Sequence, residues 1–202
     1  MITPRKAHGF VFLNDSLYVC GGLNEGDEDL DLCEKYDLRN EVWSHVAKMS
    51  KKSSYFTLIA FENKAIFKFG GVANGSLIER YDDSLDKWSE INFFCEIKNF
   101  VIPSLCGGVQ INEKEIFVFG GVENHSEVKK SFIFRVNDEN SKYPKFYVTD
   151  VNIFALPFDG FVDTGSFIEN GCIYTLVDSL KETSMNSKFL LSFNGRKWSK
   201  IF

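Results

Sequence analysis

Three pairs of adjacent glycines recur along the chain at nearly equal intervals, and each pair ends an apolar run. The runs are LYVCGG, IFKFGG and IFVFGG, and they end at Gly22, Gly71 and Gly121, spaced by 49 and 50 residues. Apolar β-branched and aromatic residues favour a buried strand, whereas glycine weakens one. Glycine lacks a Cβ and reaches positive φ, so we expect each strand to end in a sharp turn where backbone approaches backbone. The constant period predicts a repeat architecture.

Other features keep this period and define a unit of four strands. An Asn-led turn precedes each glycine pair and follows another apolar run, which is the pattern of a β-hairpin. These turns are Asn14-Asp15-Ser16, Asn63-Lys64 and Asn112-Glu113-Lys114. After the glycines and a polar loop, a short run ends in Tyr-Asp and a tryptophan follows, giving Tyr36 with Trp43 and Tyr81 with Trp88. Four antiparallel strands per unit are typical of β-propeller blades.

The third and fourth units depart from this pattern. The third contains Pro144 and has no tryptophan, and we interpret its earlier pair, Gly107-Gly108, as an interruption of its first strand. The fourth has Asn170-Gly171 as a type I′ turn. It then has Val177-Asp178 in place of the glycine pair, Phe193-Asn194 in place of Tyr-Asp, and Trp198.

The pattern resembles the kelch repeat from about Ala7 to Phe202. The matching positions are Gly21, Gly22, Gly70, Gly71, Gly120, Gly121, Tyr36, Tyr81, Trp43, Trp88 and Trp198. The resemblance implies that these residues are structural, with the aromatic ones packing one blade on the next. It implies an all-β fold, a kelch-type β-propeller, with residues 1–202 as one domain of four four-stranded blades. We expect the blades at about 7–52, 53–103, 104–160 and 161–202.

Four units leave the closure of the propeller open, because kelch rings usually have more blades and close by pairing strands from both termini. Three alternatives follow: a piece of a longer protein, a compact four-bladed ring, or an open arc completed by another chain. An open arc would expose apolar sheet faces. We favour a fragment or an arc completed by a partner, so that the four blades are part of a larger or composite ring.

Charge and composition exclude several classes of protein. The net charge of −5 and the lack of a basic stripe argue against a nucleic-acid-binding protein. No apolar run approaches the roughly 18 residues of a membrane span, and no signal sequence is evident. The five cysteines include no C-x-x-C pair, which predicts no zinc site and favours a reducing compartment. We therefore expect a cytoplasmic protein without membrane insertion.

No enzyme motif is evident. The three histidines, His8, His45 and His125, stand apart from any nucleophile pattern. The D-x-D-x-D start at Asp27 would need Gly and Glu where Leu32 and Leu38 stand, which excludes an EF-hand loop. Some kelch-like propellers are copper enzymes similar to galactose oxidase, but their ligands do not map onto this sequence. We expect no enzyme activity, metal or cofactor, and keep a propeller enzyme of that type as an alternative.

The sequence favours a protein–protein interaction module or scaffold that uses variable loops on one rim of a rigid frame. The loops after the glycine pairs are the candidates: Leu23–Asp31, Val72–Ser76, Val122–Lys130 and Ser179–Ser187. Their predicted contact residues are Asn24, Glu25, Asp27, Glu28, Asp29, Asp31, Asn74, Glu123, Asn124, His125, Glu127, Lys181 and Glu182. The expected partners are proteins, in a multi-subunit or cytoskeletal assembly. Many kelch proteins resemble ubiquitin-ligase receptors, but those carry an adaptor-binding domain that does not fit in this chain. A purely structural subunit of a large assembly is the other alternative.

Overall fold

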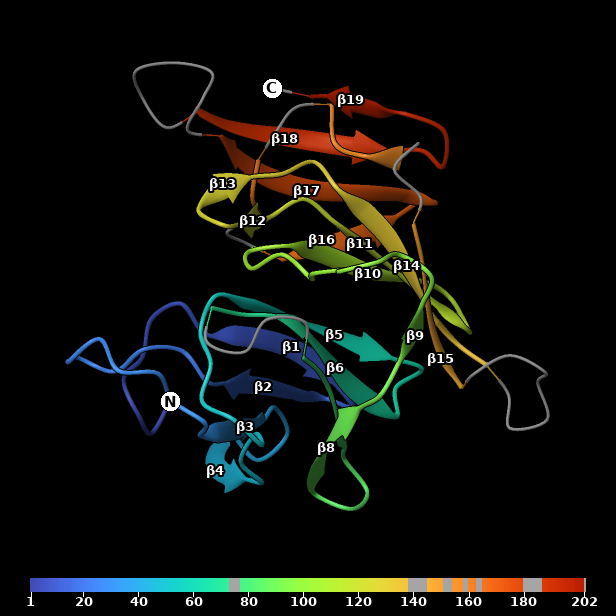
Figure 1. The fold of residues 1–202 in the computed structure, drawn as a ribbon. Helices are drawn as coiled ribbons and strands as arrows, with labels where there is room; N and C mark the ends of the chain where they lie inside the picture. The colour runs from blue at the N-terminus through green and yellow to red at the C-terminus, as the bar shows by residue number, and fades with distance from the viewer. Residues whose placement is uncertain are drawn as a thin grey trace. The chain divides into compact units, whose positions relative to one another are not determined.

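A computed structural model describes residues 1–72, 77–137, 145–150, 154–157, 160–162, 165–179 and 187–201. Its named elements are all β-strands, as Figure 1 shows. The chain divides into two compact units, Met1–Ile91 and Asn92–Phe202. Each unit is described by itself below.

The first unit holds two antiparallel sheets in which sequence neighbours are also spatial neighbours. Blade 1 has the order β1-β2-β3-β4 and blade 2 the order β5-β6-β7-β8. The strands of blade 1 are β1 (Gly9–Leu13), β2 (Ser16–Cys20), β3 (Cys33–Asp37) and β4 (Val42–Val46). Those of blade 2 are β5 (Phe56–Phe61), β6 (Ala65–Gly70), β7 (Ile78–Asp82) and β8 (Lys87–Ile91).

The second unit holds two larger sheets and a small hairpin. Blade 3 has the order β10-β11-β14-β15-β9, and blade 4 the order β16-β17-β18-β19. The strands of blade 3 are β9 (Phe94–Cys95), β10 (Gly107–Asn112), β11 (Glu115–Phe119), β14 (Ser131–Val136) and β15 (Phe146–Asp150). Those of blade 4 are β16 (Ser166–Glu169), β17 (Cys172–Ser179), β18 (Ser187–Phe193) and β19 (Trp198–Lys200). The hairpin consists of β12 (Val122–Glu123) and β13 (Ser126–Glu127).

The predicted fold class is confirmed, with two differences in blade 3. A fifth strand, β9, pairs in parallel with β15, and two residues are too few to leave a strand pattern in the sequence. The pair Gly107-Gly108 does not interrupt a strand but opens β10, opposite Phe119 and Val118. A Cβ on Gly107 would lie 2.6 Å from the Phe119 ring, so only glycine fits beside that side chain.

The glycine pairs end strands because their backbone is left-handed and crowded. All six of these glycines have positive φ, from +57° at Gly21 to +112° at Gly121. A Cβ on Gly21 would lie 2.6 Å from the Ser53 carbonyl oxygen, and one on Gly121 would lie 2.5 Å from that of Ser104. A side chain at these positions would therefore force the neighbouring backbone to move.

Blade 4 shows what happens without the glycines. Strand β17 has eight residues and passes through Val177 and Asp178 to Ser179, whereas β2 and β11 each have five and stop at the pair. Residues 177–179 continue to pair with β18. The glycines thus end the strand, since the ladder extends where they are missing.

Cross-strand register places the aromatic residues of the repeat opposite each other. Tyr36 lies opposite Trp43, with ring centroids 5.1 Å apart, and Tyr81 lies opposite Trp88 at 5.3 Å. Phe193 and Trp198 form the same pair in blade 4, at 5.0 Å. In blade 3 the paired positions are Phe134 and Val148. We call the face that carries this pair the tyrosine face of a blade, and the other the reverse face.

Within each unit, the reverse face of one blade packs on the tyrosine face of the next. In the first unit Tyr18 contacts Tyr81, with centroids 5.6 Å apart, and its hydroxyl donates to Asp83. In the second unit Phe117 stacks on Phe193 at 5.7 Å. Two apolar clusters result, one holding Leu13, Cys20, Leu58 and Ile66, the other Val109, Phe119, Ile173 and Leu191.

Candidate functional site: the loops at the glycine end of the blades

Each blade has two ends with different loops. The β1–β2 and β3–β4 turns lie at one end, the turn end, because Ser16 pairs with both Leu13 and Asp37. The glycine pair and the loop that follows it lie at the other, the glycine end, beside Cys20 and Cys33. All four candidate loops therefore leave the glycine ends of their blades.

The loop after β2 is a folded structure. The Asn24 side-chain oxygen accepts hydrogen bonds from the amides of Gly26 and Glu28, each at 2.9 Å. Leu23 forms β-bridges with both Lys6 and Asp29. This local bonding fixes a loop that its polar composition alone would leave mobile.

The charges of this loop differ in their accessibility. Glu25, Asp27 and Glu28 are exposed, whereas Asp29 and Asp31 are half-buried. Asp27 forms an ion pair with Lys6 at 2.5 Å, and the hydrogen bond to Asp27 raises the pKa of Lys6. One carboxylate oxygen of Asp29 is buried with no hydrogen-bond partner among the described residues. Of the predicted acidic contact residues, the exposed three can therefore touch a partner directly.

The loop after β11 is a small hairpin, which the sequence analysis treated as an irregular loop. Its tip residues, Asn124 and His125, have φ of +49° and +62° and are exposed. Positive φ at both tip residues is the geometry of a type I′ turn. Glu123 forms an ion pair with Lys130, and Glu127 is buried. The tip is thus the accessible part of this loop, and Glu127 is not.

The other two candidate loops are described only at their edges. Val72 is exposed, and Asn74 lies outside the described residues. Lys181 and Glu182 also lie outside them, between β17 and β18.

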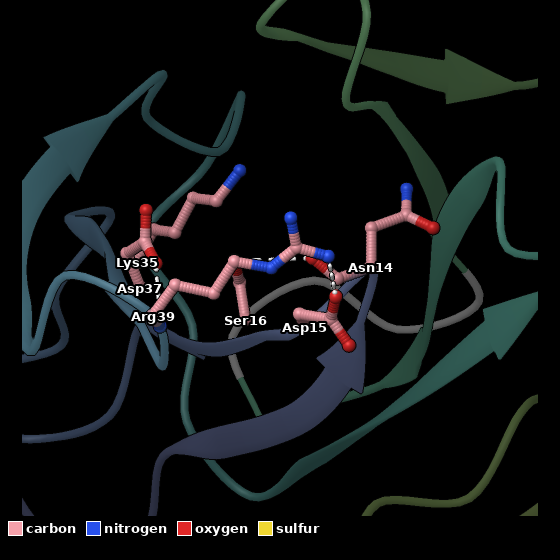
Figure 2. Close-up of a pocket in the computed structure, with 6 residues that line it drawn as sticks. All are labelled: Asn14, Asp15, Ser16, Lys35, Asp37 and Arg39. Carbon is pink, nitrogen blue, oxygen red and sulfur yellow. Dashed lines mark hydrogen bonds and ion pairs between the residues drawn. The ribbon is translucent and has the colours of Figure 1, made fainter.

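The turn end of blade 1 carries a polar hollow that the sequence analysis missed (Figure 2). Its volume is about 440 Å³, and it is lined by Asn14, Asp15, Ser16, Lys35, Asp37 and Arg39. Arg39 reaches across it to Asp15, with Nη2 to Oδ2 at 2.5 Å. Hydrogen bonds from Asn40 and the Arg39 amide lower the pKa of Asp37. The acids are paired or hold the turn, which makes the hollow a structural feature.

Two buried carboxylates at the glycine end were also missed. Glu34 accepts hydrogen bonds from the amides of Ile2 at 2.6 Å and Thr3 at 2.9 Å, and pairs with Arg5 at 2.6 Å. In blade 2, Glu79 accepts from the Ser50 amide and hydroxyl, at 2.8 and 2.6 Å. Both glutamates stand two residues before the tyrosine of the repeat, in CEKYD and IERYD, and that shared position was the available signal.

The remaining chemistry of the described residues is sparse. They contain no group of three or more His, Cys, Asp or Glu side chains that could hold a metal. All five cysteines are free thiols. Over the residues that the structure describes, no helix has the length and apolar character needed to cross a bilayer.

Comparison with known proteins adds a family match. A model described as the Kelch motif matches residues 4–50. Kelch-like protein 7 of Rattus norvegicus is 35% identical over 90 residues, which cover 44% of this chain and 15% of that protein. The kelch repeat-containing protein kel-10 of Caenorhabditis elegans is 28% identical over 129 residues, covering 60% and 21%. A RING finger domain and kelch repeat-containing protein of Dictyostelium discoideum is 31% identical over 137 residues, covering 63% and 13%. The chain thus spans about a fifth or less of these relatives.

Proposed function

Because this chain is made of kelch repeats, we propose that it is a non-catalytic protein–protein interaction module or scaffold. It recognises a protein partner through loops at the glycine ends of its blades. The observation that carries the proposal is the loop after β2, where Asn24 holds a fixed turn and three acidic side chains are exposed.

A fixed loop supports recognition because less conformational entropy is lost on binding. Its Glu25, Asp27 and Glu28 side chains favour a partner with a basic surface, since complementary charge steers association. The hairpin tip at Asn124 and His125 adds a second rigid contact, in blade 3. Together these loops differ in charge and shape, as recognition on a repeated frame requires.

The domain and cellular setting belong to the same proposal. We propose that residues 1–202 form one kelch propeller domain with blades at about 7–52, 53–103, 104–160 and 161–202, acting in the cytoplasm within a multi-subunit assembly. Five free thiols fit a reducing compartment. The length of the relatives fits a module that acts as part of a larger polypeptide or complex.

The test is charge reversal at the exposed loop acids. We expect Glu25→Lys/Glu28→Lys, in the tagged full-length protein, to reduce recovery of its specific partner at least tenfold in a pulldown quantified by mass spectrometry. The melting temperature should stay unchanged because both side chains are exposed. Asp29 is left intact, since it is half-buried and its substitution would disturb the loop itself.

A matched control carries the same change of charge at the turn ends. Glu41→Lys/Glu113→Lys reverses two exposed acids in the β3–β4 and β10–β11 turns. This control should retain the partner. Equal loss of partner in both variants would point to a general charge effect, and unchanged recovery in the loop variant would discard the loop as the recognition site.

A further inference from the structure

The two terminal blades each expose an apolar sheet face that is covered in the inner blades. On the tyrosine face of blade 1, Phe10 is 50% and Phe12 is 60% exposed, and Tyr36 and Trp43 are only half-buried. On the reverse face of blade 4, Phe167 is 55% exposed and stacks on the half-buried Tyr174. Contiguous exposed apolar surface of this kind marks an interaction site.

The inner blades show what covers such faces. Leu58 of blade 2 stands where Phe10 stands in blade 1, and it is buried in the cluster that Tyr18 of blade 1 completes. Tyr81 and Trp88, which correspond to Tyr36 and Trp43, are 1% and 7% exposed there. A tyrosine face is therefore buried by the reverse face of another blade.

One aromatic position makes the contact in both described interfaces. It is the third residue of the second strand: Tyr18 in β2, which contacts Tyr81, and Phe117 in β11, which stacks on Phe193. In blade 4 the third residue of the second strand is Tyr174. It stands on the reverse face beside Phe167, as Tyr18 stands beside Val11. The reverse face of blade 4 thus has the aromatic group that a tyrosine face receives.

We propose that this chain associates head to tail with a second copy, the reverse face of blade 4 of one copy packing on the tyrosine face of blade 1 of the other. Tyr174 of one copy meets Tyr36 of the other, and Phe167 covers Phe10 and Phe12. The contact is heterologous, because two different surfaces meet, and such contacts either close into rings or continue as chains. It uses the faces of the sheets, not the loops, so its failure would leave the proposed function standing.

The test combines self-association with complementation. We expect the full chain to self-associate in sedimentation velocity at micromolar concentration. Phe12→Asp and Phe167→Asp should each weaken association about 30-fold or more, as loss of a central aromatic contact does. Each variant keeps one intact face, so an equimolar mixture should form a one-to-one pair. Leu85→Asp, at a residue that is 70% exposed in a turn of blade 2, should leave association unchanged.

The outcomes separate the occupants of these faces. Thermal melts verify folding, and Phe12→Gln and Phe167→Gln replace any aspartate variant that melts earlier. A monomeric wild-type chain would overturn the proposal, and a melting temperature lowered by both glutamine variants would then assign the cover to the same chain. Failure of the mixed variants to pair would exclude the head-to-tail contact, and undiminished association in both would place self-association elsewhere.

Discussion

Blades 1 and 2 carry the same aromatic pair in the same geometry but in different surroundings. The ring planes of Tyr36 and Trp43 and those of Tyr81 and Trp88 are both inclined at 40°. Yet the first pair is half-buried and the second is buried. The geometry of the pair is therefore set within one sheet by strand register, whereas its burial depends on the adjacent blade.

The difference has an energetic consequence. A cross-strand aromatic pair contributes modestly by itself, and burial of a large side chain contributes several kcal/mol. The same residue type at the same position of the repeat should then differ in its contribution to stability from one blade to another.

The largest expected effect comes from the two tryptophans. Trp88→Ala should lower the free energy of unfolding by about 4 kcal/mol because it leaves a cavity in a buried cluster. Trp43→Ala should lower it by roughly 1 kcal/mol, since that side chain is half-buried. Urea denaturation at low protein concentration measures both. Equal losses would break the comparison and show that Trp43 is fully covered in solution.

A smaller effect, equal in both blades, is expected at the glycine pairs. Gly22→Val and Gly71→Val should each cost about 3 kcal/mol, because a β-branched residue is strained at positive φ and its Cβ meets neighbouring atoms. Gly171→Ala is the control, with φ of +74° and nothing within 4 Å of an added Cβ. Thermal or urea unfolding that ranked the control with the two valine variants would contradict crowding as the cause.

The smallest effect is the acid dependence of blade 1. Burial raises the pKa of Glu34, but hydrogen bonds from the Ile2 and Thr3 amides and from Arg5 outweigh it, so that the pKa lies below 4.5. A depressed pKa stabilises the fold above the unfolded value, and this contribution is lost as the pH falls through the folded pKa.

Glu34→Gln should therefore flatten the fall in melting temperature below about pH 4.5. The measurement is a series of thermal melts from neutral to acid pH, with Glu41→Gln in the exposed β3–β4 turn as the control. An unchanged acid slope in Glu34→Gln would show that the carboxylate does not keep its hydrogen bonds in solution.

The sequence was most informative where chemistry is periodic. Glycine pairs, Asn-led turns and Tyr–Trp pairs each impose a local geometry, so their recurrence predicts the blades and their strand order. The glycine end of each blade could be predicted for the same reason, because the turn at residues 21–22 fixes where the next loop leaves.

The rest depends on contacts between residues far apart in sequence. Hydrogen bonding by Asn24 folds one acidic loop, and two positive φ values fold another into a hairpin. Asp29 and Glu127 looked like surface acids because a local pattern carries no information about what packs over them. Glu34 and Glu79 were visible in the repeat, but their role requires the preceding segments to fold against them.

Strand β9 has a consequence for solubility. The outer strand β15, with the sequence FYVTD, has no lysine, and an uncovered apolar edge can add strands from other molecules until fibrils form. By pairing with Tyr147 and Val148, β9 occupies part of that edge. The segment at residues 92–96 thus also guards against aggregation, and a proteolytic cut there would convert a soluble protein into a template for precipitation.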